Sequence, residues 1–309
     1  MRRLAIAVFA ILVFVAAFDR LYLLYAHKFF DTTGRSQWIW AQHQISRNIP
    51  VAFFATRDFN LPANRRFTRI KIAVDPEYTL YFNDVLIGGR RVRKEPTLDV
   101  YDVSKLARDQ GNRIVIAARS ANGVGGVLAS IDVTDEYKNI VPTGSDWKIV
   151  RAWHEDLLVR DAPQWVTAPM LIGRPPVGRW NFLSPQPGAF ATPLQKVVQA
   201  RSVFRLKTAI PEVRDVSGVP VVVPQPIAAT VYDFGFTRGH AQLTTTYDNR
   251  VARAVRVRFA NDRSELQSVE GPIDEFVFAA GETAITDPEA RSFRYVMVYG
   301  GQATVSVAQ

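Results

Sequence analysis

The strongest constraint on the fold of this chain is the recurrence of short segments in which apolar and polar residues alternate, with no long helical period between them. Residues 70–74 and 78–82 both alternate, and Asn83-Asp84 separates the second segment from a return strand at residues 85–87. A period of two places the apolar side chains on one face of a strand, and Asn-Asp is a turn-forming pair. We therefore expect antiparallel β-structure with a hairpin around Asn83-Asp84.

Similar segments continue to the C-terminus. Residues 114–116 and 127–133 extend the first set of strands, and a second set begins at Thr230. The glycines at residues 123–126 lie between two strands with no helix after them, so we expect a hairpin turn there instead of a phosphate-binding loop. A chain of 309 residues is long enough for two ordinary domains. The expected fold is all-β, with two antiparallel β-sandwich (jelly-roll-like) domains.

A proline-rich stretch separates the two sets of strands. Half of the 18 prolines fall between residues 173 and 226, and proline interrupts both helices and β-ladders. We expect residues 181–228 to form an extended crossing segment that packs along the domains. The first sandwich would then occupy residues 31–180, and the second would occupy residues 229–309.

The first 30 residues are expected to form a membrane anchor. Met1-Arg2-Arg3 precedes fifteen apolar residues at positions 4–18, and a second apolar piece reaches Tyr25. Counted through Tyr25, the segment has about 22 residues and a helical length of roughly 33 Å, which matches a hydrocarbon core about 30 Å thick. A signal peptide cleaved before Phe18 is the competing interpretation. We favour a retained transmembrane helix over residues 1–30.

The charges at the N-terminus orient this helix. Arg2 and Arg3 favour a cytoplasmic N-terminus, so the protein should be a single-pass component of the cytoplasmic (inner) membrane with most of the chain in the periplasm. Small and aromatic side chains are the expected contacts with lipid and neighbouring membrane helices. These contacts are Ala5, Phe9, Phe14, Tyr22 and Tyr25.

The amino-acid composition excludes several kinds of catalytic and metal-binding site. The chain has no cysteine, which excludes disulfides, thiol nucleophiles and iron–sulfur clusters. Its four histidines are not spaced as metal ligands, and Leu158 stands where a zinc motif beginning at His154-Glu155 would need a second histidine. We expect no metal and no cofactor. The net charge of +9 suits acidic lipid or an acidic protein, and for an extracytoplasmic chain we expect no nucleic-acid partner.

Two groups of residues are candidates for a partner interface. Trp38 and Trp40 are two apart, so on a strand they would face one way, although core packing is the alternative for tryptophan. The densest basic run is RRVRK at residues 90–94, for which a solvated face is the alternative. We assign both groups to a surface that contacts a partner protein, and we expect charge reversal in the basic run to weaken that contact without unfolding the domain. The assigned residues are Trp38, Trp40, Arg90, Arg91, Arg93 and Lys94.

Several stretches resemble a known family. These are IKIAVDPEYTLYFNDVLIGG at residues 70–89, the strands at residues 98–133, VYDFGFTRGHAQLTTTY at residues 231–247, and FRYVMVYG at residues 293–300. The first two are similar to the galactose-binding-like jelly roll of bacterial α-L-rhamnosidases, and the last two resemble the β-sandwich that follows it. The likeness covers roughly residues 38–309. In the family, the two catalytic carboxylates lie in a helical (α/α)₆ barrel that has no counterpart in this sequence.

The resemblance therefore implies non-catalytic domains, and we expect no enzyme activity. We favour an accessory or scaffold subunit of a larger membrane-protein complex, in contact with integral membrane proteins and the lipid bilayer. A photosynthetic reaction-centre–antenna complex is the assembly we would name first, ahead of a respiratory complex. The alternative is a membrane-tethered carbohydrate-binding (rhamnose-type) module. An enzyme remnant with residual glycosidase activity is the third interpretation.

We predict that the mature protein keeps its N-terminal helix, because the apolar segment is long enough to span a bilayer. N-terminal sequencing of the protein isolated from its native membranes should begin within the first few residues. A mature chain that begins near Phe18 would instead identify the segment as a cleaved signal peptide.

Overall fold

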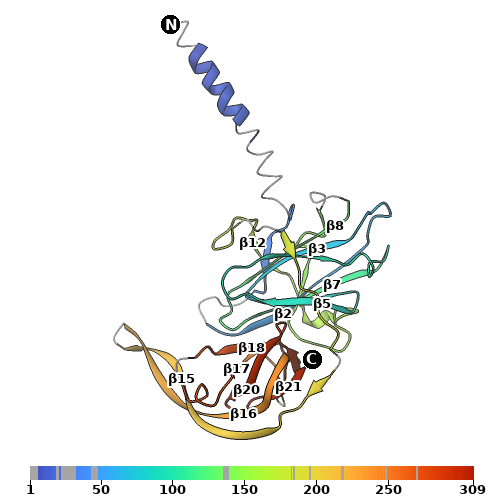
Figure 1. Ribbon diagram of the computed structural model, residues 1–309. Coiled ribbons are helices and arrows are strands. Elements are labelled where there is room, and N and C mark those ends of the chain that lie inside the picture. Colours follow the sequence, from blue (N-terminus) through green and yellow to red (C-terminus); the bar gives the residue numbers. More distant parts are fainter. Residues whose placement is uncertain are drawn as a thin grey trace.

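The structure is a computed structural model that describes residues 6–18, 21, 33–42, 48–134, 139–181, 183, 185–194, 196–216, 219–245, 247, 249–268 and 271–309. Two β-rich units lie one above the other, with the chain from Val197 to the C-terminus in the lower unit (Figure 1). Strands dominate, and the ladders are almost all antiparallel. The all-β, antiparallel fold expected from the sequence is confirmed at this level.

The first unit is a sandwich of two sheets. One sheet contains, in spatial order, β12 (Met170–Gly173), β1 (Trp38–Trp40), β8 (Gly126–Asp132), β3 (Arg69–Asp75), β6 (Leu98–Asp102) and β13 (Pro185–Pro187), with β9 (Asn139–Ile140) paired to β8. The other contains β11 (Val166–Thr167), β10 (Lys148–Val150), β2 (Val51–Phe59), β7 (Asn112–Ser120), β4 (Glu77–Phe82) and β5 (Val85–Arg91). A short 3₁₀ helix, η1 (Pro163–Trp165), precedes β11. The pairing of β13 with β6 is parallel.

The β4–β5 hairpin forms as predicted. Tyr78, Leu80 and Phe82 point into the core between the two sheets. Asn83 and Asp84 have φ values of 48° and 73°, the left-handed conformation that a tight two-residue hairpin turn requires at both positions. The alternation therefore fixes which side chains of β4 enter the core and which face outward.

The glycines at residues 123–126 do not form the predicted hairpin turn. They connect β7 and β8, which belong to opposite sheets, so this segment crosses from one sheet to the other. A side chain at Gly126 would lie within 2.9 Å of the rings of Trp38 and Trp180. The glycine is therefore required by the close approach of two tryptophan rings to the backbone.

Trp38 and Trp40 are core residues, which contradicts their assignment to a partner surface. Both are fully buried because β1 lies inside the sheet, between β12 and β8. Trp38 stacks on Trp180 with a centroid distance of 4.6 Å, whereas Trp40 meets Phe53 edge-on at 4.8 Å. A register shift between Trp38 and Ile39 interrupts the alternation, so the two rings belong to different apolar clusters.

The second unit is built from one eight-stranded sheet that bends back on itself. The path is β14 (Val197–Val198), β21 (Thr304–Ala308), β16 (Val219–Thr244), β20 (Arg291–Tyr299), β17 (Arg253–Ala260) and β18 (Asp274–Phe278), with β15 (Ser202–Val216) and β19 (Ala284–Thr286) also paired to β16. Strand β16 bends near Gly235, where φ is +67° and the register with β20 shifts. Its first part pairs with β15 and β20, and its last part pairs with β19 and β21. The core lies between these two parts.

The proline-rich region is more regular than predicted. Residues 185–194 do pack along the first sandwich, since β13 pairs with β6. Residues 202–216 and 219–228, however, belong to a long hairpin of the second unit, so the crossing segment ends well before residue 228. Proline is compatible with this hairpin because an edge strand has positions whose N–H groups face away from the ladder.

The N-terminal residues 6–18 are helical, and their apolar side chains, including Phe9 and Phe14, are exposed. Within the described part of the chain, no helix has both the length and the apolar character needed to cross a bilayer. Ala5, Tyr22 and Tyr25 lie outside the described residues. The transmembrane anchor therefore stays a prediction.

Replacing Gly126 by alanine should destabilise the first sandwich by about 1–3 kcal/mol, because the added methyl group would displace the Trp38 and Trp180 rings. Urea unfolding followed by tryptophan fluorescence would measure the change. Gly144→Ala is the matched control, since a side chain there meets nothing within 4 Å. Equal stabilities of the two variants would contradict this account of the tryptophan pair.

Candidate binding cleft between the two sandwiches

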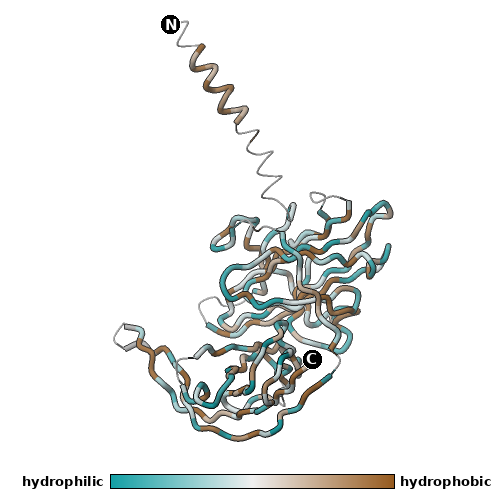
Figure 2. Tube along the Cα trace, in the orientation of Figure 1, coloured by the Kyte–Doolittle hydropathy of each residue, from teal (hydrophilic) through white to brown (hydrophobic). Residues whose placement is uncertain are grey.

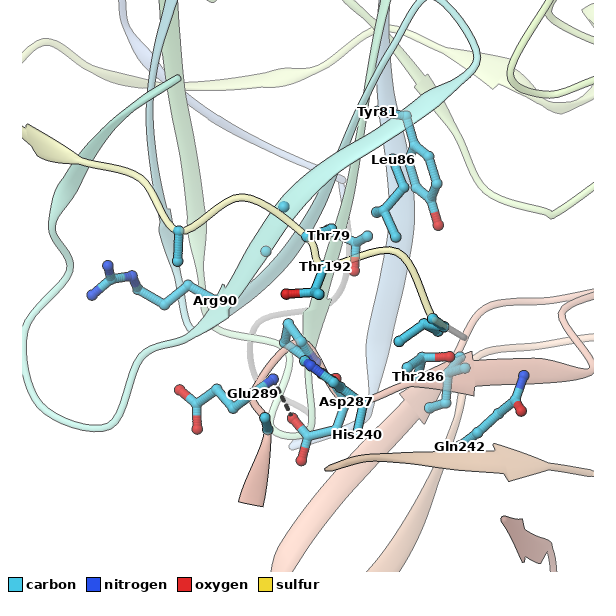
Figure 3. A pocket seen from close by; sticks show the side chains of 18 of the residues that line it. Thr79, Tyr81, Leu86, Arg90, Thr192, His240, Gln242, Thr286, Asp287 and Glu289 are labelled. Atoms are coloured by element: carbon cyan, nitrogen blue, oxygen red, sulfur yellow. Dashed lines mark hydrogen bonds between the residues drawn. The ribbon is translucent and has the colours of Figure 1, made fainter. Parts of the chain in front are cut away.

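A cleft of about 670 Å³ lies where the two units meet. Its walls come from β4 and β5 of the first sandwich, from residues 189–194 of the crossing segment, and from β16, β19 and residues 286–290 of the second sandwich. In Figure 3, Tyr81 and Leu86 lie on the side of the first sandwich, and His240, Gln242 and Thr286 lie on the side of the second. The cleft therefore exists only when both units are in place.

The alternation of β4 supplies one wall of the cleft. Tyr78, Leu80 and Phe82 fill the core, so Thr79 and Tyr81 point to the opposite face of the same strand and line the cleft. Burial raises the pKa of Tyr81, and the nearby Arg119 guanidinium opposes this shift. Thr79 and Tyr81 thus both present neutral hydroxyl groups at ordinary pH.

A buried ion pair joins the two units at the floor of the cleft. Arg119 of β7 lies 2.5 Å from Glu282 of the second unit, and both side chains are more than nine-tenths buried. The backbone N–H of Ala279 also donates to Glu282. Burial raises the pKa of the Glu282 carboxyl, and the Arg119 charge acts against that rise. The second terminal nitrogen of Arg119, Nη1, has no hydrogen-bond partner within the described part of the chain.

The basic run at residues 90–94 also faces the second unit. Arg91 is buried, lies 2.9 Å from Glu77 and 3.7 Å from Asp274, and stacks over the Phe276 ring at 4.1 Å. Burial would lower the pKa of Arg91, but Glu77 and the carboxylates of the second unit more than offset this and raise it. Arg91 is therefore a charged group held inside the interdomain junction.

The other residues of the run divide between the junction and solvent. Arg93 lies 3.5 Å from both Asp274 and Glu289 of the second unit. Arg90 lies 2.9 Å from the buried Asp99 of its own sandwich, and Lys94 is exposed. The expected partner surface is thus an internal interface for Arg91 and Arg93, and charge reversal there would disturb the junction itself. Sequence alone could not show this, because Asp274 and Glu289 lie about 180 to 200 residues further along the chain.

The carboxylates of the cleft are held by arginines. Asp287 lies 2.8 Å from Arg291, and Glu289 lies 3.5 Å from Arg93. Burial raises the pKa of Asp287, while Arg91 and Arg291 act to lower it. His240 Nδ1 lies 2.8 Å from the backbone carbonyl oxygen of Asp287. The cleft is therefore a fixed array of hydrogen-bonding groups.

An exposed aromatic ring on the crossing segment completes the cleft. Phe190 is 54% exposed, and its ring packs edge-on against Tyr101 at 5.3 Å. The segment is fastened on both sides of this ring, where Gly188 N–H donates to Val100 and Ala191 N–H donates to Ile87. No motif in the sequence marks Phe190 as a site residue. A phenylalanine among prolines between two domains was the one available signal.

The described residues contain no group of three or more histidine, aspartate or glutamate side chains that could hold a metal ion. His27 and His43 lie outside these residues. His154 and His240 are the two histidines that the structure describes, and His240 belongs to the cleft.

The architecture is thus that of a two-unit β-sandwich protein with a cleft between the units that is lined by both polar and apolar side chains. No known protein family and no curated protein matches the sequence. Among solved structures, an α-L-rhamnosidase from Dictyoglumus thermophilum is 16% identical, with a TM-score of 0.49, over 89% of this chain and 35% of its own. The α-L-rhamnosidase from Aspergillus terreus is 15% identical, with a TM-score of 0.47, over 89% of this chain and 36% of its own.

A lectin from Pleurotus ostreatus, solved in complex with GalNAc, is 17% identical, with a TM-score of 0.39, over 89% of this chain and 77% of its own. The likeness to α-L-rhamnosidases expected from the sequence is therefore found among solved structures. The chain spans about a third of the length of the rhamnosidases it matches.

Replacing Arg119 by methionine should destabilise the protein by about 3–5 kcal/mol, because it leaves the buried Glu282 without its partner. Replacing Glu282 by glutamine as well should recover much of the loss, since the neutral amide needs no counter-charge. Urea unfolding of the single and double variants at neutral pH would measure both effects.

The loss in Arg119→Met should also depend on pH. The pKa of Glu282 is already raised by burial, and removing Arg119 raises it further, so the folded variant favours the protonated carboxyl. The destabilisation should therefore be small below the ordinary glutamate pKa and grow as the pH rises towards neutrality. A loss of the same size at the ordinary glutamate pKa, about 4.3, and at neutral pH would contradict a buried, unpaired carboxylate.

Proposed function

We propose that this protein is a non-catalytic carbohydrate-binding module that holds its ligand in the cleft between the two sandwiches. The observation that carries the proposal is the lining of the cleft, which combines polar groups of several kinds with an exposed aromatic ring. Hydroxyl, amide and guanidinium groups match the donors and acceptors of a sugar, and an aromatic ring packs on its C–H face. The groups that would make these contacts are Thr79, Arg119, Phe190, Thr192 and Gln242.

The size and rigidity of the cleft support this proposal. A volume of about 670 Å³ lies within the range of about 300–1,000 Å³ that is common for small-molecule sites. The Arg119–Glu282 pair and the fastened crossing segment hold the lining groups in position before a ligand arrives. A preformed site avoids much of the entropic cost of ordering side chains during binding.

We further propose that the module is anchored in the cytoplasmic membrane by its N-terminal helix and faces the periplasm. The exposed apolar side chains of residues 6–18 support this anchoring, because a surface of this kind is unfavourable in water. The same surface favours a second candidate function, an accessory subunit whose helix packs beside other membrane helices. A photosynthetic or respiratory assembly stays a prediction within that second function.

Titration calorimetry of the full chain in a mild detergent would test the binding function, with L-rhamnose, galactose and N-acetylgalactosamine as ligands. We expect one of these sugars to bind with a dissociation constant of about 1 mM or lower, equivalent to about 4 kcal/mol. Phe190→Ala should weaken binding about fivefold, since an aromatic contact contributes about 1 kcal/mol. Phe236→Ala is the matched control, because Phe236 is 77% exposed and lies outside the cleft.

The same preparation should not release aryl alcohol from aryl rhamnosides above the buffer rate. Hydrolysis that survives repurification and is abolished by one carboxylate substitution would overturn the non-catalytic assignment. Absence of binding for every sugar tested, or equal losses in Phe190→Ala and Phe236→Ala, would count against the cleft. Co-purification of the intact chain with other membrane proteins, without any sugar binding, would favour the accessory-subunit function.

A further inference from the structure

The hairpin formed by β15 and β16 extends beyond the second sandwich. We use the term arm for its outer part, residues 211–216 and 219–224, in which each residue pairs with one across the hairpin, from Pro211 with Pro224 to Val216 with Val219. Strand β20 pairs with β16 only as far as Ala229. Within the part of the chain that the structure describes, no third strand pairs with the arm, which projects from the lower unit in Figure 1.

One face of the arm is apolar and open to solvent. Directly paired residues lie on the same face of a hairpin, so Pro211, Pro224, Val213 and Val222 share one face, which we call the outer face. Val213 is 67% exposed and Val222 is 61% exposed, and both prolines are exposed as well. The tube coloured by hydropathy shows brown segments along this part of the chain (Figure 2).

At the base of the arm, the opposite face of the hairpin is buried. Ile210, which points to that face, is buried in a cluster with Leu266, Tyr295 and Met297. The second unit therefore covers the inner side of the hairpin base and leaves the outer face bare. A two-stranded ribbon gains little stability by itself in water, so an apolar ribbon held out from its domain indicates a binding role.

The prolines limit how a partner can bind. Proline has no N–H, so within a ladder it occupies positions whose N–H would point away from the paired strand. The open edge of β15 lacks a backbone N–H donor at Pro211. The open edge of β16 lacks N–H donors at Pro220, Pro224 and Pro226. Addition of a partner strand to either edge is therefore disfavoured. Recognition has to use the side chains of the outer face.

Two cations lie on the same face, next to the apolar residues. Arg205 and Lys207 are an even number of positions from Pro211 and Val213 along β15, so all four residues lie on the same face. Both Arg205 and Lys207 are exposed. Neither has an ion-pair partner among the residues that the structure describes. Their charge is complementary to acidic side chains at the edge of an apolar surface.

A protein surface fits this pattern better than a lipid bilayer. Glu212, Arg214 and Asp215 belong to the arm, and placing ionisable residues among lipid chains is unfavourable. We infer that the outer face of the arm is a docking surface for a partner protein that presents an apolar patch bordered by acidic side chains. This inference is independent of the cleft, to which no residue of the arm contributes.

Site-specific photocrosslinking in native membranes would test the inference. A benzophenone amino acid would be placed at position 213 or 222 of the full chain. The labelled protein would be expressed in the organism whose genome encodes the protein. We expect both positions to crosslink to the same protein, which mass spectrometry would identify. Val251 is the matched control position, since it is 72% exposed and lies outside the arm. The crosslink should be absent there.

Charge reversal then tests the chemistry of the partner. Arg205→Glu with Lys207→Glu should reduce crosslinking from position 213 by about tenfold. In the chain that carries the benzophenone residue but keeps Arg205 and Lys207, raised salt should also reduce crosslinking. Lysine in place of an acidic residue near the crosslinked site of the partner should restore crosslinking to the Arg205→Glu, Lys207→Glu chain. Unchanged thermal unfolding of the variants would show that the fold is intact.

Each other outcome would overturn the inference. A crosslink to a second copy of the chain would identify a self-association surface. Binding of the purified protein to vesicles of phosphatidylcholine and phosphatidylglycerol, lost in Val213→Asp, would identify a lipid-binding arm. A lack of crosslinks from positions 213 and 222, equal crosslinking from position 251, or failure of the charge swap would exclude the proposed partner.

Discussion

The buried charges at the junction determine where the two sandwiches lie relative to each other, and the cleft depends on that arrangement. Arg91 and Arg119 of the first unit reach Asp274 and Glu282 of the second. Removing such charges from water offsets much of their attraction, so the pairs add little to stability in comparison with apolar packing. Their geometry is nevertheless demanding, because a displaced unit would leave charges buried without partners. The junction therefore fixes orientation more than it adds free energy.

A second buried network positions the crossing segment. Asp99 is fully buried and accepts hydrogen bonds from the Tyr78 hydroxyl at 2.5 Å and from Gln186 at 3.1 Å. Burial raises the pKa of Tyr78 well above its ordinary value, so the hydroxyl keeps its proton and acts as the donor. Burial likewise raises the pKa of the neighbouring Tyr101 to about 12. Gln186 belongs to the crossing segment, so this network fixes the position of the residues that precede Phe190. It thereby links the core of the first sandwich to the cleft.

Alternating apolar and polar residues predicted local strand structure well, whereas contacts between distant parts of the chain were predicted poorly. The β4–β5 hairpin follows from alternation and one turn, both of which a short stretch of sequence contains. Trp38 and Trp40 were assigned to a surface because alternation alone cannot show a register shift or the strands on either side of β1. The basic run was assigned to an external partner because Asp274 and Glu289, which Arg91 and Arg93 reach, belong to the other unit. The long hairpin was not predicted because its prolines argued against a strand. An open sheet edge accommodates proline, whereas a central strand does not.

The surplus of positive charge is distributed in a way that distinguishes the two binding surfaces. The whole chain has a net charge of +9, and the arginines at the junction add little to it because they face carboxylates. Arg205 and Lys207 have no such partners within the described residues, and their field extends into solvent. Screening by salt acts strongly on exposed charges and weakly on buried ones. Ionic strength should therefore affect events at the arm much more than ligand binding in the cleft, and this difference separates the two surfaces without any substitution.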